Sequence, residues 1–213
     1  MKKNRTYLVF VLVAAVACLR ATPVAAQAGP EQTQQLLKTV EGTVKAIGES
    51  RAQLQKTVAT YNSITEMTAK DLKSAYKDLG KDVAESEKKV ADGRPKVDEM
   101  NTAAASYFSA WKASAAAISD PGLRKRSEER LAAARTRHSA IHAAGQQAAD
   151  LYATFTKTLR DHVTFLGHDL NPGAVANLKP DAAKLNKKAD ELLASIDATV
   201  ATANSNISAL QPQ

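Results

Sequence analysis

Apolar side chains recur at steps of three and four residues along most of the chain, the spacing that places them on one side of a helix. One unbroken series covers residues 72–111, and two others cover residues 131–166 and 178–210. A less regular series covers residues 36–61. Series of this length are typical of coiled-coil helices that pack lengthwise against one another. The pattern therefore predicts an all-α protein with four helices.

Residues that begin or end helices separate the four series. Asp120-Pro121-Gly122 forms a tight reversal in which proline suits a first helical turn. Asn171-Pro172-Gly173 ends the third series, and Pro180 is expected to open the fourth helix. Thr68 and Asp71 have the spacing of an N-cap and its third helical residue. The predicted helices cover about residues 31–64, 69–118, 121–167 and 180–210.

Pro95 conflicts with a helix through the second series, because proline removes a backbone hydrogen bond and clashes with the preceding turn, at a cost of about 3 kcal/mol. The apolar series nevertheless keeps its phase across Gly93-Arg94-Pro95. A loop has no reason to keep that phase, whereas a kinked helix does. We therefore expect one continuous, kinked helix here.

The predicted lengths give an elongated antiparallel bundle. The second and third helices have about 47 residues each, or about 70 Å, whereas the first and fourth have about 30 residues. The linkers bring the ends of all four helices together near Thr68, Asn171 and Pro180. The sequence thus predicts a four-helix base with a projecting two-helix coiled-coil finger, in which residues 100–138 lie beyond the shorter helices.

The first 28 residues have the features of a secretory signal peptide. Three basic residues precede an uncharged apolar run of 12 residues, and small residues occupy the expected cleavage positions after residue 26 or residue 28. The run is shorter than the ~18 residues that a membrane-spanning helix needs. We therefore expect residues 29–213 to form a single domain in the periplasm or outside the cell.

Cys18 supports an alternative processing route. It is the only cysteine of the chain, and Ala15-Val16-Ala17 before it resembles a lipoprotein processing site, although such sites usually carry leucine where Ala15 stands. Soluble release is the preferred hypothesis, and a lipoprotein anchored to the membrane through Cys18 is the alternative. The exported domain can form no internal disulfide bond.

Removal of the leader changes the charge of the protein. The whole chain has 29 basic and 22 acidic side chains, a net charge of +7. Four of the basic residues and none of the acidic ones precede residue 29, so the remaining domain carries only +3. Nucleic acid is therefore not an expected partner. Basic and acidic residues are interleaved along the helices, so we expect membrane contact only through a lipid anchor.

The end of the third predicted helix carries the most distinctive motif. It reads Phe165-Leu166-Gly167-His168-Asp169-Leu170-Asn171, and together with Phe108-Ser109-Ala110-Trp111 it resembles a bacterial family catalogued as domain of unknown function 2959. The resemblance covers about residues 61–210 and implies an exported, helical envelope protein, in several members with a lipoprotein-type start. It implies no activity. Asp169 stands where the family usually has asparagine.

Two sets of side chains are candidates for function. Tyr107 and Trp111 fit the apolar series, whereas Phe108 lies beside it and is expected to be partly exposed on the finger. Phe108 and Trp111 are therefore a candidate partner contact. The second set, at the base of the bundle, is a candidate small-ligand site and consists of Asp161, His162, His168, Asp169 and Asn171.

The sequence predicts no catalytic residues, no metal site and no cofactor. His138 and His142 share one face of a helix, but no carboxylate falls on the same stripe nearby, and a stable metal site needs three or four ligands. The chain has no glycine-rich phosphate loop and no nucleophile turn. We expect a non-enzymatic scaffold or interaction module of the cell envelope that binds a protein partner or itself. The alternative is a helical bundle that binds a small ligand or a metal through the base histidines.

Overall fold

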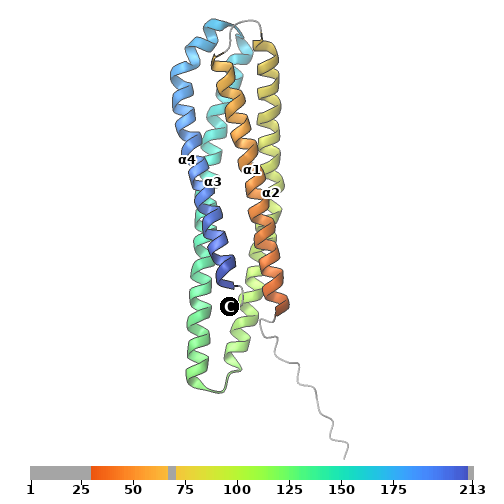
Figure 1. Ribbon diagram of the computed structural model, residues 1–213, viewed down its shortest axis with the longest axis vertical. Helices are drawn as coiled ribbons and strands as arrows, with labels where there is room; N and C mark the ends of the chain where they lie inside the picture. Colours follow the sequence, from red (N-terminus) through yellow and green to blue (C-terminus); the bar gives the residue numbers. More distant parts are fainter. Residues whose placement is uncertain (1–29, 67–70, 211–213) are drawn as a thin grey trace, which may run out of the picture.

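Four long α-helices make up the part of the chain that the computed structural model describes, residues 30–66 and 71–210. They are α1 (Pro30–Glu66), α2 (Leu72–Ala116), α3 (Pro121–His168) and α4 (Pro172–Leu210). Successive helices run in opposite directions along one long axis (Figure 1). The prediction of an all-α antiparallel bundle is confirmed. The predicted signal peptide, Cys18 and Thr68 lie outside the described residues.

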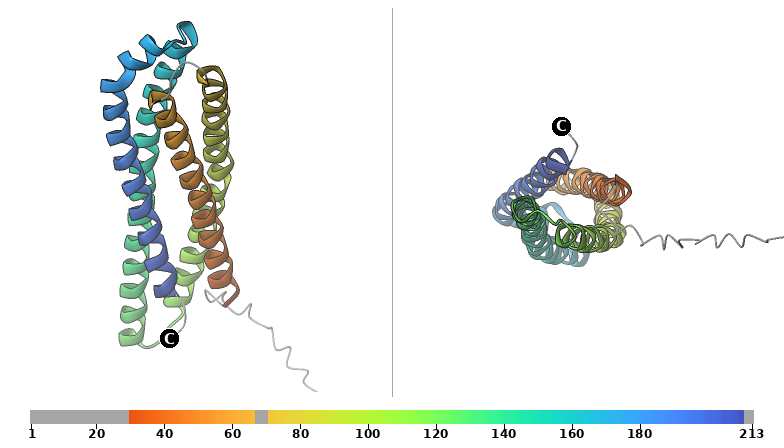
Figure 2. Two further views of the ribbon diagram at one scale, coloured as in Figure 1. Left: turned by 45° about the horizontal axis from the view of Figure 1, so that its top comes forward. Right: turned by 90° about the horizontal axis from the view of Figure 1, so that it is seen from below.

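The helices form a ring in which each one contacts two neighbours. α1 and α3 each lie between α2 and α4. Figure 2 shows this ring from below. Antiparallel neighbours joined by short connections are the up-and-down topology of a four-helix bundle.

Two groups of buried apolar side chains hold the ring together. The larger group lies toward the α3–α4 connection and includes Leu54, Leu79 and Leu159. The smaller group lies toward the α2–α3 connection and includes Met100 and Ile141. Each fully buried leucine contributes roughly 1.5–3 kcal/mol to stability, so these groups account for the packing of the four helices.

α2 is a continuous helix through Pro95, as the unbroken apolar series predicted. The proline ring is exposed, so it occupies no core space. One residue later, the backbone carbonyl of Lys96 accepts a hydrogen bond from the Thr43 hydroxyl of α1, at 2.9 Å. This bond ties α2 to α1 directly after the position where the proline lacks an N–H group.

The prediction that Pro180 opens the fourth helix is wrong. α4 begins at Pro172, and Pro180 lies inside it. The Asn171 side chain accepts a hydrogen bond from the backbone N–H of Ala174 at 2.9 Å, which makes it an N-cap, and proline is favoured at the position after such a cap. Ala174 and Val175 are buried, so the added turns cover the end of the core. Figure 2 shows these first turns of α4 at an angle to the remainder of the helix, as expected for an internal proline.

The projecting hairpin is present but shorter than predicted. α1 has 37 residues and α4 has 39, both longer than the sequence pattern indicated. Their ends supply Leu36 and Ala203 to the same buried group as Met100 and Tyr107. The predicted finger boundaries at residues 100 and 138 are therefore wrong. Only the last turns of α2 and the first turns of α3 extend beyond α1 and α4 (Figure 1); we call residues 111–130 the hairpin end.

Candidate functional site

Phe108 is buried, with 9% of its surface exposed, so the prediction that it is partly exposed is wrong. Leu36 and Val40 of α1 and Ile207 of α4 line a small cavity together with Phe108. The sequence prediction placed Phe108 beyond the ends of α1 and α4, whereas both helices reach it. The ring also meets the His138 ring edge-on, with 5.7 Å between the ring centres. Phe108 therefore belongs to the core and presents little surface to a partner.

Trp111 is the half-buried member of the predicted pair. Its ring packs edge-on against Tyr107, with 5.6 Å between the ring centres. Its indole N–H donates a hydrogen bond of 3.1 Å to the Ser127 hydroxyl of α3. The Arg130 guanidinium lies 6.0 Å from the ring centre, in the range of a cation–π contact. Trp111 is thus held in place from two helices and still keeps part of its surface exposed.

Two hollows lie along this part of the bundle, one small and one wide open. The cavity beside Phe108 has a volume of about 20 Å³, room for about one water molecule. A more open depression of about 570 Å³ lies along α3. Its walls come from α3 alone, so no second helix closes over it: His142, Ala143, Gln146, Gln147, Asp150, Leu151 and Thr154.

His138 and His142 remain a pair without further metal ligands in the part of the chain that the structure describes. His142 is exposed, and no three or more His, Cys, Asp or Glu side chains of residues 30–66 and 71–210 gather as metal ligands would. Burial lowers the pKa of His138, and the positive charge of His142 lowers it further. A neutral His138 ring packed on Phe108 is a core residue.

The five polar residues predicted at the base do not share one environment. Asp169 is the C-cap of α3, and its carboxylate accepts a hydrogen bond from the side-chain amide of Asn171. Asn171 in turn caps α4. These two residues shape the connection between α3 and α4. Asp161 and His168 are exposed.

His162 pairs with a residue that the sequence did not single out. Its Nδ1 lies 2.8 Å from the hydroxyl of Tyr61 in α1. Burial, assisted by the nearby Asp181, raises the pKa of Tyr61 to about 12, so the phenol keeps its proton at neutral pH. Burial also lowers the pKa of His162, although the negative charges of Asp181 and Asp161 act in the opposite direction. A neutral imidazole that accepts a hydrogen bond from the Tyr61 hydroxyl satisfies both groups and joins α1 to α3.

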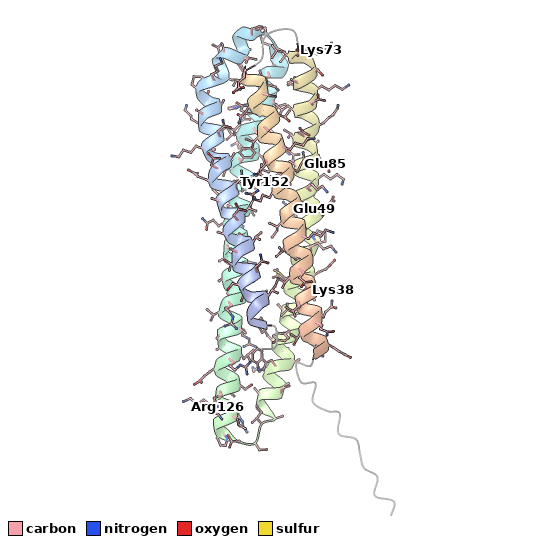
Figure 3. All side chains as sticks on the ribbon, in the orientation of Figure 1. Lys38, Glu49, Lys73, Glu85, Arg126 and Tyr152 are labelled. Atoms are coloured by element: carbon pink, nitrogen blue, oxygen red, sulfur yellow. The ribbon has the colours of Figure 1, made fainter. Side chains whose placement is uncertain are left out.

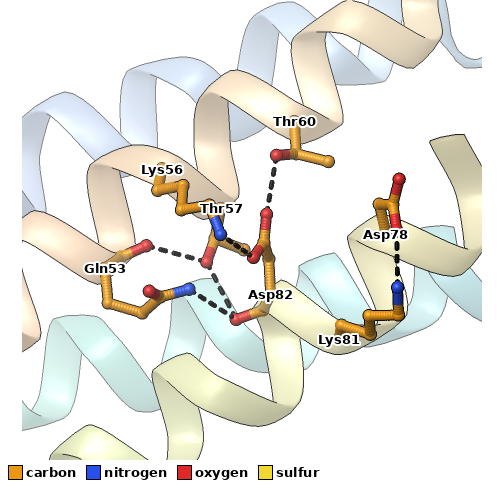
Figure 4. A network of polar contacts seen from close by, with 7 residues as sticks. All are labelled: Gln53, Lys56, Thr57, Thr60, Asp78, Lys81 and Asp82. Carbon is orange, nitrogen blue, oxygen red and sulfur yellow. Dashed lines mark hydrogen bonds and ion pairs between the residues drawn. The ribbon is translucent and has the colours of Figure 1, made fainter.

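Asp82 of α2, which has four hydrogen-bond partners on α1, was not predicted. It is buried, with 6% of its surface exposed. Its carboxylate accepts hydrogen bonds from the Lys56 ammonium and the Thr60 hydroxyl, both at 2.7 Å. Its backbone carbonyl accepts from the Gln53 amide at 3.2 Å and the Thr57 hydroxyl at 3.0 Å. Figure 4 shows these four α1 side chains around one residue of α2.

The pKa of Asp82 reports the strength of this network. Burial acts to raise it, but the hydrogen bonds from Lys56, Thr60 and Gln53 together with the positive charge of Lys56 bring it below its ordinary value. The carboxylate is therefore ionised at neutral pH and fully engaged with α1. The signal in the sequence was an acidic residue directly before Val83 of the apolar series.

Among the described residues, no helix is both long and apolar enough to cross a membrane. A family model described as "Protein of unknown function (DUF2959)" matches residues 24–210 of the chain. No curated protein and no solved structure gives a significant match to it.

Proposed function

The chain belongs to the DUF2959 family of proteins of unknown function, and we propose that it is a non-enzymatic scaffold or interaction module of the cell envelope. It acts through its coiled-coil helices and binds a protein partner or a second copy of itself. The observation that carries the proposal is the hairpin end, where α2 and α3 extend beyond α1 and α4 (Figure 1). Two helices that leave the ring lose the cover of two neighbours and expose side chains that the bundle would otherwise bury.

Two side chains of the hairpin end support this role. Leu123 has 51% of its surface exposed. Trp111 is half-buried and held by Ser127 and Arg130. A fixed tryptophan with an exposed edge is typical of the residues that dominate binding energy at protein interfaces.

The buried polar groups support a non-enzymatic role. Asp82 is enclosed by four α1 side chains, and His162 bonds to buried Tyr61. A catalytic acid or base needs access to a substrate. In the described residues these two groups are instead occupied by contacts between helices.

Export is part of the proposal and rests on the leader-like composition of residues 1–28. The mass of the protein purified from its own host gives its mature N-terminus. Cleavage after residue 26 or 28 indicates release into the periplasm or the medium. A lipid-modified Cys18 indicates a membrane-anchored lipoprotein, which labelling with a fatty-acid probe would also detect.

Photo-crosslinking in cells tests the interaction role. A photoreactive amino acid at Leu123 is expected to give a discrete adduct with a partner or a second copy. The same amino acid at Lys77, an exposed position of α2 near the opposite end of the bundle, is the matched control and is expected to give none. Trp111→Ala is expected to reduce the Leu123 adduct roughly tenfold while the helix content stays the same by circular dichroism.

The proposal is contradicted if Leu123 gives no adduct in the native host. It is also contradicted if the adduct from Lys77 is equally strong, because the contact would then be independent of the hairpin end. Unchanged crosslinking in Trp111→Ala would move the interface away from this residue.

A further inference from the structure

Arginine is concentrated near the hairpin end. Residues 29–213 contain 17 lysines and 8 arginines. Within residues 124–137 this preference is reversed, with five arginines and one lysine. Elsewhere in residues 29–213, lysines outnumber arginines by 16 to 3. We call the five residues the arginine cluster: Arg124, Arg126, Arg130, Arg135 and Arg137.

The same region holds the excess positive charge of the domain. Residues 112–137 carry seven basic and three acidic side chains, a net charge of +4, whereas the rest of residues 29–213 carries a net charge of −1. One of the three acids, Asp120, is the N-cap of α3. Its carboxylate accepts a hydrogen bond from the backbone N–H of Leu123. Figure 3 shows Arg126 on the projecting hairpin and Lys73 at the opposite end of the molecule.

Two of the three arginines elsewhere in residues 29–213 have carboxylate partners on other helices. Arg51 binds Asp197 with two hydrogen bonds, at 2.6 and 2.8 Å. Arg160 binds Glu87 at 2.7 Å. The planar guanidinium suits this paired contact with a carboxylate better than an ammonium group does.

The arginine cluster makes no such contact among the described residues. In the part of the chain that the structure describes, none of its five members forms an ion pair with a carboxylate. Arg124 donates to the backbone carbonyl of Ile118, at 2.9 and 2.7 Å. Arg130 and Arg135 lie over the rings of Trp111 and Phe108. Stacking fixes a guanidinium group but leaves its edge N–H donors available for an acceptor.

We propose that the arginine cluster binds an acidic protein surface whose carboxylates pair with the guanidinium groups of Arg126 and Arg130, while Leu123 and Trp111 supply the apolar contact. This inference rests on the proposed interaction role and names the chemistry of the partner. The preference for arginine over lysine favours a protein, because an anionic membrane attracts both residue types through charge alone. Arginine and tryptophan, but not lysine, are enriched at protein interfaces.

Trp111 provides the readout, since it is the only tryptophan of the chain. The processed full-length protein is titrated with poly-L-glutamate, and tryptophan emission follows binding next to Arg130. Poly-L-glutamine is the neutral control and is expected to leave the emission unchanged. Vesicles of phosphatidylglycerol test a lipid surface of the same charge sign.

Variants of Arg126 separate charge from geometry. Arg126 is exposed, so its replacement is expected to leave the fold intact. Arg126→Glu is expected to weaken binding of poly-L-glutamate about fivefold, and Arg126→Lys about threefold, because lysine keeps the charge but loses the paired hydrogen bonds. Lys73→Glu makes the same charge change at the opposite end and is expected to alter affinity less than about twofold.

Three results would overturn the inference: no emission change with poly-L-glutamate, equal weakening by Lys73→Glu, or tighter binding to the vesicles than to poly-L-glutamate. The last would assign the arginine cluster to a membrane. A crosslinked adduct at Leu123 combined with no binding of poly-L-glutamate would reject the acidic partner and retain the interaction role. No adduct at Leu123 would reject the interaction role itself.

Discussion

Asp82 is a buried carboxylate in a helix whose neighbouring buried side chains, Leu79 and Val83, are apolar. Removing a charge from water is costly unless hydrogen bonds replace the lost hydration. Lys56 and Thr60 supply those bonds from α1 (Figure 4). One residue therefore sets the alignment of α1 against α2, because a shift along either helix would leave the carboxylate without partners.

Asp82→Asn is expected to lower the free energy of unfolding by about 2 kcal/mol at pH 7, since the amide offers one acceptor where the carboxylate offers two. The folded-state pKa of Asp82 lies below its ordinary value of about 3.9. The stabilisation is therefore fully present above about pH 4 and is lost as the pH falls through the folded-state pKa. Chemical denaturation at several pH values is expected to show the wild type and the variant converging as the pH falls below about 4.

Asp78→Asn is the matched control for this change. Asp78 lies one turn before Asp82 and pairs with Lys81 at 2.9 Å, but its side chain is more than half exposed. Its replacement is expected to change the unfolding free energy by no more than about 0.5 kcal/mol. Equal losses in the two variants would show that the burial of Asp82 is not the cause.

At the scale of the helices, Gly167 of α3 lies against the side chain of Tyr76 in α2. A methyl group added at this position would lie 2.5 Å from the Tyr76 hydroxyl and 3.4 Å from the ring carbon that carries it. Gly80 on α2 has nothing within 4 Å of the same added group. The two glycines therefore make a matched pair, one in a crowded contact and one in open space.

Gly80→Ala is expected to raise the free energy of unfolding by about 0.5–1 kcal/mol, because alanine is the better helix former. Gly167→Ala is expected to lower it by about 1 kcal/mol, since the Tyr76 ring must move. In a Tyr76→Phe background the hydroxyl is gone, and Gly167→Ala is expected to cost little. Chemical denaturation of Gly80→Ala, Gly167→Ala, Tyr76→Phe and the double variant Tyr76→Phe/Gly167→Ala measures these changes. An equal cost of Gly167→Ala with tyrosine or phenylalanine at position 76 would show that the Tyr76 hydroxyl is not the cause.

The helix boundaries show what local chemistry predicts well. The reversal at Asp120-Pro121-Gly122 was predicted and observed, because a cap and a proline act within one turn of the chain. Continuity through Pro95 followed from the phase of the apolar series. The start of α4 was misplaced, because Pro172 and Pro180 are both acceptable at the first turn of a helix. Only the Asn171 cap and the burial of Val175 distinguish them.

The whole molecule is a long rod whose length is set by α3. Its 48 residues span about 72 Å at 1.5 Å per residue. Small-angle X-ray scattering of the processed monomer is therefore expected to give a maximum dimension of about 75–80 Å. A value near 50 Å would contradict the extended hairpin. A value above about 120 Å would indicate association end to end, which crosslinking at Leu123 would detect independently.

The sequence by itself determined that four helices form, where the α2–α3 reversal lies, and that the chain resembles the family to which it belongs. These features depend on side-chain spacing and on contacts within a few residues, both of which the chain carries locally. The tertiary structure alone decided that Phe108 is buried, that Asp82 has four partners on α1, and that the arginine cluster has no carboxylate partner in the described residues. Burial and pairing depend on how far a neighbouring helix reaches and which of its sides it presents. A helical repeat shows which side of a helix is apolar, but it does not specify which part of a neighbouring helix lies beside it.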